Sequence, residues 1–314
     1  METIAALAAL ALLLRSAPLG TAAAPAPSAV QGELKPTVEA EPRGEWTVIE
    51  HANGVKAREG RVWRGRRDGP WKAWYENGAR RYEGRFEDYQ RVGHWVHWRE
   101  NGHKEAEGEW QHGAEHGTWI LYDRNGAKQA EGRYERGQRA GKWTSWWDNG
   151  KKSKEGEWVA GVRQGEWTNY SYEGKLLSRG RYQAGEQQGL WTKWHDGEQK
   201  EFEAYFVVGR EDGPYTRWHP NGQVEASGAY VAGKMDGDWV GYHSNGQRSY
   251  QGSYHRGFQV GTWTFWYPNG QKRSEGPYVG GKRDGKWEDW KEDGSPNEEL
   301  SGLYSEGQKQ EEKP

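Results

Sequence analysis

The chain has 314 residues with a formal net charge of −2, from 44 Lys and Arg against 46 Asp and Glu, which gives no general electrostatic case for binding nucleic acid. It contains no cysteine, which excludes disulfides and thiol chemistry. Only 33% of the residues are hydrophobic and the mean hydropathy is −1.19, but 21 Trp and 17 Tyr recur periodically, so we expect aromatic packing in place of an aliphatic core.

Residues 1–24 resemble a secretory signal peptide, because the apolar run Ile4–Leu14 is followed by small residues. The run ends at Arg15 and is too short to span a bilayer, so we expect no transmembrane span in the mature chain. The sequence therefore predicts export to the periplasm, the cell surface or the medium. Residues 25–43 are rich in Pro and Ala and are expected to form a flexible tether.

A glycine recurs every 24 residues from Gly69 to Gly285, and one looser repeat precedes these at Gly44. A fixed period of this length predicts a repeat array, here residues 44–304. Taking this glycine as position 0 of each repeat, we number the following positions +1 to +23. The polar residues 305–314 are expected to be a disordered tail.

Each repeat reads as a β-hairpin. Positions +1 to +7 are rich in β-branched and aromatic residues, as expected of a strand. Asn-Gly at +8 and +9 predicts a two-residue type I′ turn, and positions +18 to +23 are expected to form a loop to the next repeat. The predicted fold is all-β: an elongated array of about eleven 24-residue hairpin repeats in one continuous, twisted antiparallel sheet.

The turn places position +2 opposite +15. Position +2 is Trp in every registered repeat except that of Tyr215, and +15 is Gly in most, although Ala204 replaces one of them. A ring that lies over a bare strand glycine stabilises cross-strand pairs, so we assign these residues a structural role. They are Trp71, Trp95, Trp119, Trp143, Trp167, Trp191, Trp239, Trp263 and Trp287, with Gly84, Gly108, Gly132 and Gly156.

The opposite face carries an aromatic residue at +5 and a basic residue at +11, whose expected cross-strand partner is +6. The ring ladder includes Trp74, Trp98, Trp146, Trp194, Trp218 and Trp266, and the basic stripe is Arg80, Lys104, Lys128, Lys152, Lys200, Arg248 and Lys272. We treat both as hypothetical binding residues for an anionic polymer, lipid head groups or an acidic protein. The alternative is a solubilising row whose charge Glu residues balance.

Three histidines, His195, His219 and His243, share position +6. Equivalent positions are two strands apart, roughly 9–10 Å, which is too far for a shared zinc ion, so a solvated stripe is favoured. A looser group of His94, His97, His112 and His116 is split between the two faces. Nucleophile, phosphate-loop and dinucleotide motifs are absent from the sequence, so we expect no metal, no cofactor and no enzymatic activity.

The repeat unit resembles the MORN repeat in its bacterial variant. The match is carried by Gly141, Trp143, Trp146, Asn149, Gly150, Glu155, Gly156, Trp158 and Gly161. This resemblance implies stacked hairpins that bind proteins or lipids without catalysis. Many bacterial chains with this variant are labelled YwqK-like antitoxin components of toxin–antitoxin systems.

Three functions follow from these patterns. The first is a non-catalytic scaffold with a protein partner, for which an anionic lipid or a glycan is a further ligand class. The second is an antitoxin or immunity component of a toxin–antitoxin system. The third is a cell-wall or polysaccharide-binding repeat protein that uses exposed rings.

Overall fold

The computed structural model describes residues 43–195 and 198–311, and these residues form β-strands and turns without helices. The predicted signal peptide (1–24) and almost all of the predicted tether (25–43) lie outside the described residues. The strands are β1 (Glu45–Glu50), β2 (Lys56–Trp63), β3 (Arg66–Trp74), β4 (Arg80–Glu87), β5 (Gln90–Trp98), β6 (Lys104–Gln111), β7 (Ala114–Tyr122), β8 (Lys128–Glu135), β9 (Gln138–Trp146), β10 (Lys152–Val159), β11 (Val162–Tyr170), β12 (Leu176–Gln183), β13 (Glu186–Trp194), β14 (Lys200–Val207), β15 (Arg210–Trp218), β16 (Val224–Val231), β17 (Lys234–Tyr242), β18 (Arg248–His255), β19 (Phe258–Trp266), β20 (Lys272–Val279), β21 (Lys282–Arg283), β22 (Gly285–Asp289), β23 (Gly302–Ser305) and β24 (Gln308–Lys309).

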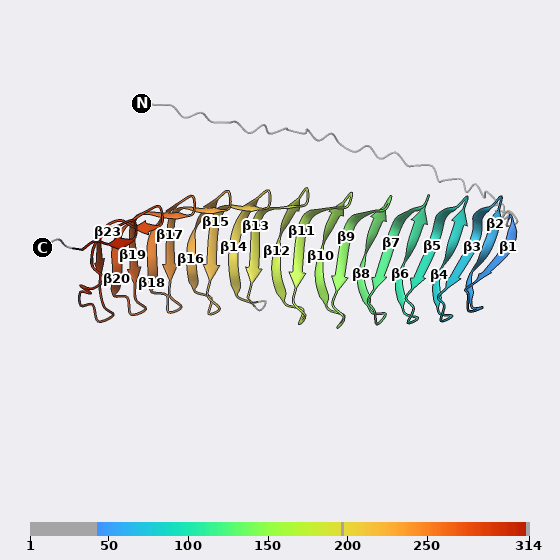
Figure 1. Cartoon of the computed structure of the whole chain (residues 1–314), viewed down its shortest axis with the longest axis horizontal. Coiled ribbons are helices and arrows are strands. Elements are labelled where there is room, and N and C mark those ends of the chain that lie inside the picture. Colours follow the sequence, from blue (N-terminus) through green and yellow to red (C-terminus); the bar gives the residue numbers. More distant parts are fainter. Residues whose placement is uncertain (1–42, 196–197, 312–314) are drawn as a thin grey trace, which may run out of the picture. The chain divides into compact units, whose positions relative to one another are not determined.

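The strands follow one another side by side in chain order (Figure 1) in one 24-stranded antiparallel sheet. Each strand pairs with its sequence neighbour except that β21 and β22 both pair with β20. The predicted all-β repeat array is thus confirmed. Each repeat supplies one hairpin, such as β9–β10, and a tight turn leads to the next. The short strand β24 lies within residues 305–314, for which the sequence predicts a disordered tail.

The Asn-Gly pairs close their hairpins through a three-residue loop, and the predicted two-residue type I′ turn is wrong at this position. The Trp147 N–H donates to the Lys151 carbonyl (2.8 Å), and the Gly150 N–H donates to the Trp147 carbonyl (3.0 Å). Gly150 has a φ of 79°, whereas Asn149 is not among the residues with positive φ. These bonds are those of a type I turn followed by a left-handed glycine.

A β-bulge compensates for the longer loop. Lys152 lies opposite Trp146 and Lys154 lies opposite Ser145, so Ser153 is an extra residue on its strand. Position +11 therefore pairs with +5, and the predicted partner at +6 is wrong. Beyond the bulge the predicted register returns, and +2 lies opposite +15 as expected.

The asparagine at +8 stabilises the turn through hydrogen bonds of its side chain. The Asn149 carbonyl oxygen Oδ1 accepts a hydrogen bond from the Lys151 N–H (3.0 Å), and Asn149 Nδ2 donates to the Tyr172 carbonyl in the next repeat (2.6 Å). Six other asparagines donate to the next repeat in the same way: Asn53, Asn77, Asn101, Asn221, Asn245 and Asn269. Each such residue shapes its own turn and ties it to the neighbouring one.

The type I′ turn occurs instead at +19 and +20, where the sequence predicts a loop. Ala160 and Gly161 both have positive φ, 49° and 77°, and they join the paired residues Val159 and Val162. Both central residues of a type I′ turn need positive φ, which accounts for the glycine at +20. The next strand therefore begins at +21, before the repeat glycine at position 0.

Each indole at +2 covers a glycine of the preceding repeat. The Trp167 Cα lies opposite Gly156 in the preceding repeat and opposite Gly180 in its own. Its ring lies over Gly156, where an added Cβ would be 2.2 Å from Trp167 Cδ2. The Trp167 Nε1–H donates to the Glu157 carbonyl (3.2 Å), and the side chain is 3% exposed. The predicted cover within one hairpin, Trp143 over Gly156, is thus replaced by a contact between repeats.

Ala204 replaces the glycine at +15 and Tyr215 replaces the tryptophan at +2, and each replacement accounts for the other. Ala204 at +15 lies opposite Tyr215 at +2 of the following repeat. A methyl group at residue 204 occupies the space that an indole needs, and the smaller ring of Tyr215 packs there instead. Trp191, in the same repeat as Ala204, covers Gly180.

The indoles alternate with the rings at +17 in an edge-to-face ladder, which forms the core of this single-layer array. Tyr182, for example, lies between Trp167 and Trp191, with ring centroids 6.0 and 5.1 Å away. Arginines cover parts of the ladder: the Arg139 guanidinium lies 4.4 Å from the Trp143 ring and 5.3 Å from that of Trp158. Packing is therefore shared between adjacent repeats.

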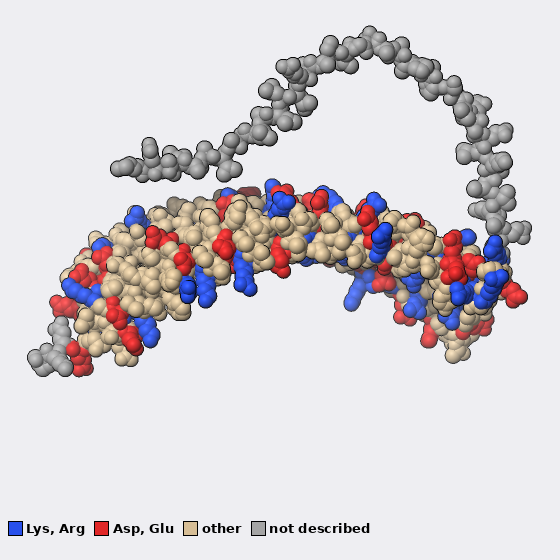
Figure 2. Space-filling view, turned by 90° about the horizontal axis from the view of Figure 1, so that it is seen from above, with Lys and Arg blue, Asp and Glu red and all other residues tan. Residues whose placement is uncertain are grey.

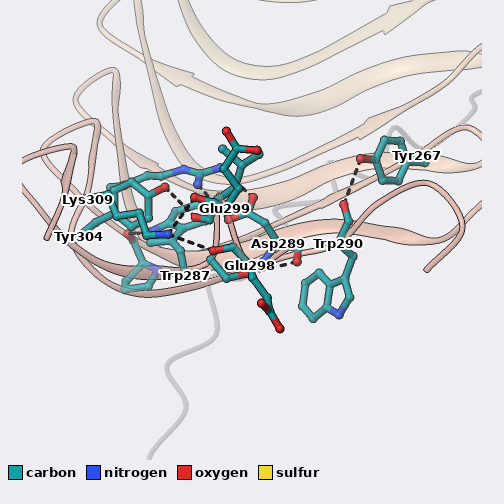
Figure 3. A network of polar contacts seen from close by, with 12 residues as sticks. Tyr267, Trp287, Asp289, Trp290, Glu298, Glu299, Tyr304 and Lys309 are labelled. Carbon is teal, nitrogen blue, oxygen red and sulfur yellow. Dashed lines mark hydrogen bonds and ion pairs between the residues drawn. The ribbon is translucent and has the colours of Figure 1, made fainter. Parts of the chain in front are cut away.

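At the C-terminal end, an irregular segment after β22 closes the ladder (Figure 3). Trp287 is fully buried, and the Arg283 guanidinium lies 3.9 Å from its ring. Arg283 also makes two bonds to the buried Asp289 carboxylate (3.1 and 3.3 Å). The Lys309 ammonium donates to the carbonyls of Glu298 and Glu299. Together with the packing of Tyr304 against Trp287, these contacts hold the C-terminal end of the described ladder.

Gly156→Ala is expected to lower the free energy of unfolding by about 1–3 kcal/mol, because the new methyl group would overlap the Trp167 ring. Glu157→Ala, at the next residue but with an exposed side chain, should change it by less than about 0.5 kcal/mol. Urea unfolding followed by circular dichroism measures both. Equal midpoints for Gly156→Ala and the unmodified chain would contradict the indole–glycine contact.

Tyr215→Trp alone should destabilise the array, whereas Ala204→Gly together with Tyr215→Trp should restore the contact of the other repeats. We expect a favourable coupling free energy of about 1 kcal/mol or more between these two substitutions. A double-mutant cycle in urea measures it. Coupling of Ala204 to Trp191 in its place would show that the contact lies within one repeat.

Candidate binding surface

The two faces of the sheet have different chemistry because side chains alternate along each strand. The indoles at +2 and the rings at +17 occupy one face, which we call the indole face. The rings at +5, the bases at +11 and the carboxylates at +14 occupy the other, which we call the pair face. All the predicted binding residues lie on the pair face, where the +5 rings are partly buried.

The predicted basic stripe is paired with carboxylates on the same strands. The ion pairs are Arg80–Glu83 (2.8 Å), Lys104–Glu107 (2.7 Å), Lys128–Glu131, Lys152–Glu155 (3.0 Å), Lys200–Glu203 (2.6 Å) and Lys272–Glu275 (2.8 Å). Arg248 donates to the Gln251 side chain (3.2 Å). Figure 2 shows cations and anions interspersed on the face that it displays. The binding role of the stripe stays a prediction, but its positive charge is locally balanced.

The stripe and the ring ladder meet between repeats. The Lys128 ammonium lies 4.6 Å from the ring centroid of Trp146 in the following repeat, and Lys200 lies 5.3 Å from Trp218. The same contact joins Arg80 to Trp98, Lys104 to Tyr122 and Lys272 to Trp290. Each base therefore fills the space over the next +5 ring while it holds its own carboxylate.

The same contact occurs in the looser first repeat, which the sequence reasoning missed. The Lys56 ammonium binds Glu59 (2.6 Å) and lies 5.1 Å from the Trp74 ring. Shifting that repeat by one residue would have revealed the pair from the sequence.

The Glu155 carboxylate is held ionised by its hydrogen-bond partners. Hydrogen bonds from Lys142, Lys152 and the Tyr170 hydroxyl lower the pKa of Glu155 to about 2. The Tyr170 hydroxyl donates to Glu155 at 2.9 Å, and burial and this bond raise the pKa of Tyr170. Such a carboxylate stays charged at neutral pH and keeps its lysine in place.

The histidines at +6 form hydrogen bonds between adjacent repeats. They do not form the predicted solvated stripe. Nε2 of His195, His219 and His243 lies 3.0, 2.9 and 2.9 Å from the carbonyl oxygen at +5 of the next repeat. A carbonyl oxygen only accepts, so Nε2 carries the proton. Tyr267 replaces histidine at this position, and its hydroxyl donates to the Trp290 carbonyl (3.0 Å), as Figure 3 shows.

The looser histidine group is divided between the faces as the sequence predicts. His97 stacks on Trp95 on the indole face, with ring centroids 5.9 Å apart, and burial lowers its pKa. His94 lies 3.3 Å from the Glu109 carboxylate.

Two repeats lack the base and the carboxylate. Leu176 and Arg179 stand at +11 and +14 in one of them, and Val224 and Ser227 in the other. A hollow of about 610 Å³ lies beside Leu176 and Arg179, and it extends to Leu190 and Trp194 of the next repeat. A second hollow of about 530 Å³ is lined by Val224 and Ser227 and reaches Tyr242 of the next repeat.

These hollows lie where a lysine would otherwise cover the next +5 ring. Leu190 is 51% exposed, and its cross-strand partner Tyr205 is 45% exposed. Arg179 Nη2 lies 3.4 Å from the Glu166 carboxylate, and both side chains are more than half exposed. Smaller hollows of about 380 and 360 Å³ lie beside Glu155 and beside Lys128, in repeats that keep the base–carboxylate pair. In the described part of the chain, no helix has the length and apolar character needed to cross a bilayer.

Comparison with known families supports the repeat type. A family model described as the MORN repeat variant matches five segments, at residues 67–88, 163–184, 211–232, 235–256 and 259–279. Each segment covers one hairpin turn, which is Asn-Gly in four of them and Glu173-Gly174 in the segment 163–184. No curated protein matches the chain.

Among solved structures, the chain is similar to parts of much larger chains. The crystal structure of TcdB2-TccC3-Cdc42 is 10% identical over 74% of this chain, with a TM-score of 0.18. The Tc holotoxin pore of Photorhabdus luminescens carrying the TccC3-D651A mutation is 10% identical over 84%, also with a TM-score of 0.18. This chain covers 14% and 16% of the respective chains, and neither likeness bears on its function. The family comparison therefore identifies five repeats of the MORN variant in this chain, at residues that the structure folds as successive hairpins.

Proposed function

We propose that the chain is a non-catalytic repeat scaffold that binds a protein partner on its pair face. The observation that carries this proposal is the local loss of the base–carboxylate pair at Leu176 and Arg179, which leaves a hollow beside exposed apolar surface where six other repeats carry an ion pair. The MORN variant matches support a scaffold that binds protein or membrane. On the pattern of residues 1–24, we further propose that the scaffold is exported.

A protein partner is favoured over a membrane by the charges on the pair face. Six of the seven bases in the predicted stripe hold a carboxylate, so an anionic membrane would meet as many negative groups as positive ones. A polysaccharide would need open rings, but bases of the preceding repeats lie over several +5 rings. An antitoxin or immunity role would be a special case of protein binding.

The full chain is expected not to sediment with phosphatidylserine vesicles at physiological salt, because its stripe is neutralised in place. Replacing Glu83, Glu131, Glu203 and Glu275 by Gln should leave four bases unpaired and produce sedimentation. Vesicle co-sedimentation with and without salt measures both. Sedimentation of the unmodified chain would favour the membrane alternative.

A photo-crosslinking residue placed at Leu190, on the pair face, should capture a discrete protein partner in the native cells. The same residue at Lys154, which is exposed on the indole face, is the matched control and should capture none. Mass spectrometry of the adducts identifies the partner. Identical adducts from both positions, or none from Leu190, would refute binding on the pair face.

A further inference from the structure

We propose that the hollow beside Leu176 binds an extended acidic-apolar peptide segment, in which a carboxylate and an apolar side chain lie on the same side of the backbone. This inference rests on the proposed protein-binding function and specifies the chemistry of the partner. It follows from a comparison of this repeat with the repeats that keep the base–carboxylate pair.

The filled repeats show what the positions at +11 and +14 accommodate. In those repeats the nitrogen of the base at +11 lies 2.6 to 3.0 Å from a carboxylate oxygen at +14. The base also covers the +5 ring of the next repeat. In the open repeat Leu176 removes the base, so the Trp194 ring lines a hollow. Arg179 reverses the charge at +14. A ligand can therefore supply the carboxylate that this repeat lacks at +14.

The anion-binding side of the hollow has two guanidinium groups. Arg179 lies between two threonines, opposite Thr168 on β11 and Thr192 on β13, and Arg181 lines the same hollow two residues further along β12. Within residues 43–195 and 198–311, Arg181 has no ion pair, and Arg179 has only the long contact to Glu166. A carboxylate bound by a guanidinium fork forms two parallel hydrogen bonds, and it would displace the exposed Glu166.

The apolar side of the hollow is formed by Leu176, Leu190 and Trp194. Leu190 and Tyr205, which face each other on β13 and β14, extend it over the next strand. A Leu or Phe side chain of a ligand would bury this surface. In an extended peptide, residues i and i+2 point to the same side, which suits a carboxylate next to an apolar group.

A peptide fits this site better than a membrane surface does. The neighbouring repeats present the carboxylates of Glu155 and Glu203 on the same face, and a flat anionic surface would meet them as well. A narrow segment can contact the two arginines without approaching those carboxylates.

The test uses the full chain and a synthetic peptide of three Leu-Ser-Glu-Ser units, with a peptide of three Leu-Ser-Lys-Ser units as the charge control. Leucine methyl NMR reports on the site directly, because Leu176 and Leu190 line the hollow whereas Leu121 and Leu303 lie elsewhere. We expect the Glu peptide to shift the methyl signals of Leu176 and Leu190 only, and the Lys peptide to shift none.

The double substitution Leu176→Lys with Arg179→Glu rebuilds the pair of the other repeats, so it should preserve the fold. It should weaken binding of the Glu peptide at least about tenfold. Val224→Lys with Ser227→Glu makes the same change in the second open repeat and should leave the affinity at the first hollow unchanged. An unmoved Leu121 signal in both variants verifies folding.

Unchanged affinity in the Leu176→Lys, Arg179→Glu variant would overturn the inference, as would equal binding of the two peptides. Movement of the Leu176 and Leu190 signals by phosphatidylserine vesicles and not by the Glu peptide would assign the site to lipid and overturn it as well. If Leu190 crosslinks a protein while the Glu peptide fails to bind, the scaffold proposal stands and only the ligand chemistry is wrong.

Discussion

The structure depends on one contact: the indole at +2 lies over a bare glycine of the repeat before it, with Tyr215 over Ala204 as the exception. The glycine lets the ring approach the backbone, and the indole N–H satisfies a carbonyl of that neighbouring strand, as Trp167 does for Glu157. Because the contact joins repeats, it replaces the central core that a chain of this hydropathy lacks. The edge-to-face ladder, the asparagine bonds and the histidine bonds act across the same boundary. Stability is thus built from neighbour contacts along the array.

The same regularity distinguishes structural from functional residues on the pair face. Where a base and a carboxylate recur, they satisfy each other and cover the next aromatic ring, so their repetition indicates an architectural role. The proposed binding site lies where the pattern is broken: Leu176 stands at the position of the base that covers the next +5 ring in other repeats, and Arg179 stands at the position of the carboxylate. The stripe that first suggested a function is therefore less informative than its interruptions. A binding hypothesis based on residues that recur at one repeat position must also consider the residues at the neighbouring positions, which can neutralise or cover them.

Much of the fold could be predicted from the sequence, and the misses have physical causes. Asn-Gly was interpreted through backbone φ, whereas Asn149 acts through its side chain and only Gly150 is left-handed. The longer loop and the extra Ser153 cancel, so the register of Trp143 and Gly156 was correct although the turn type was wrong. The type I′ turn at Ala160 and Gly161 was missed because a non-glycine residue in its first position gives little signal.

By itself the sequence determined the 24-residue period, the antiparallel hairpins and the pairing of tryptophan with glycine, because these follow from spacing along a single repeat. Only the tertiary structure decided which glycine each ring covers and which charges remain unpaired. Trp167 lies opposite glycines on both neighbouring strands, and periodicity treats the two as equivalent. The direction of the ring depends on the bulge beside Gly165 and on the side-chain rotamer, which are defined only once the strands have paired. In the sequence, only the joint departure of Ala204 and Tyr215 from the Gly and Trp pattern indicates which glycine each ring covers.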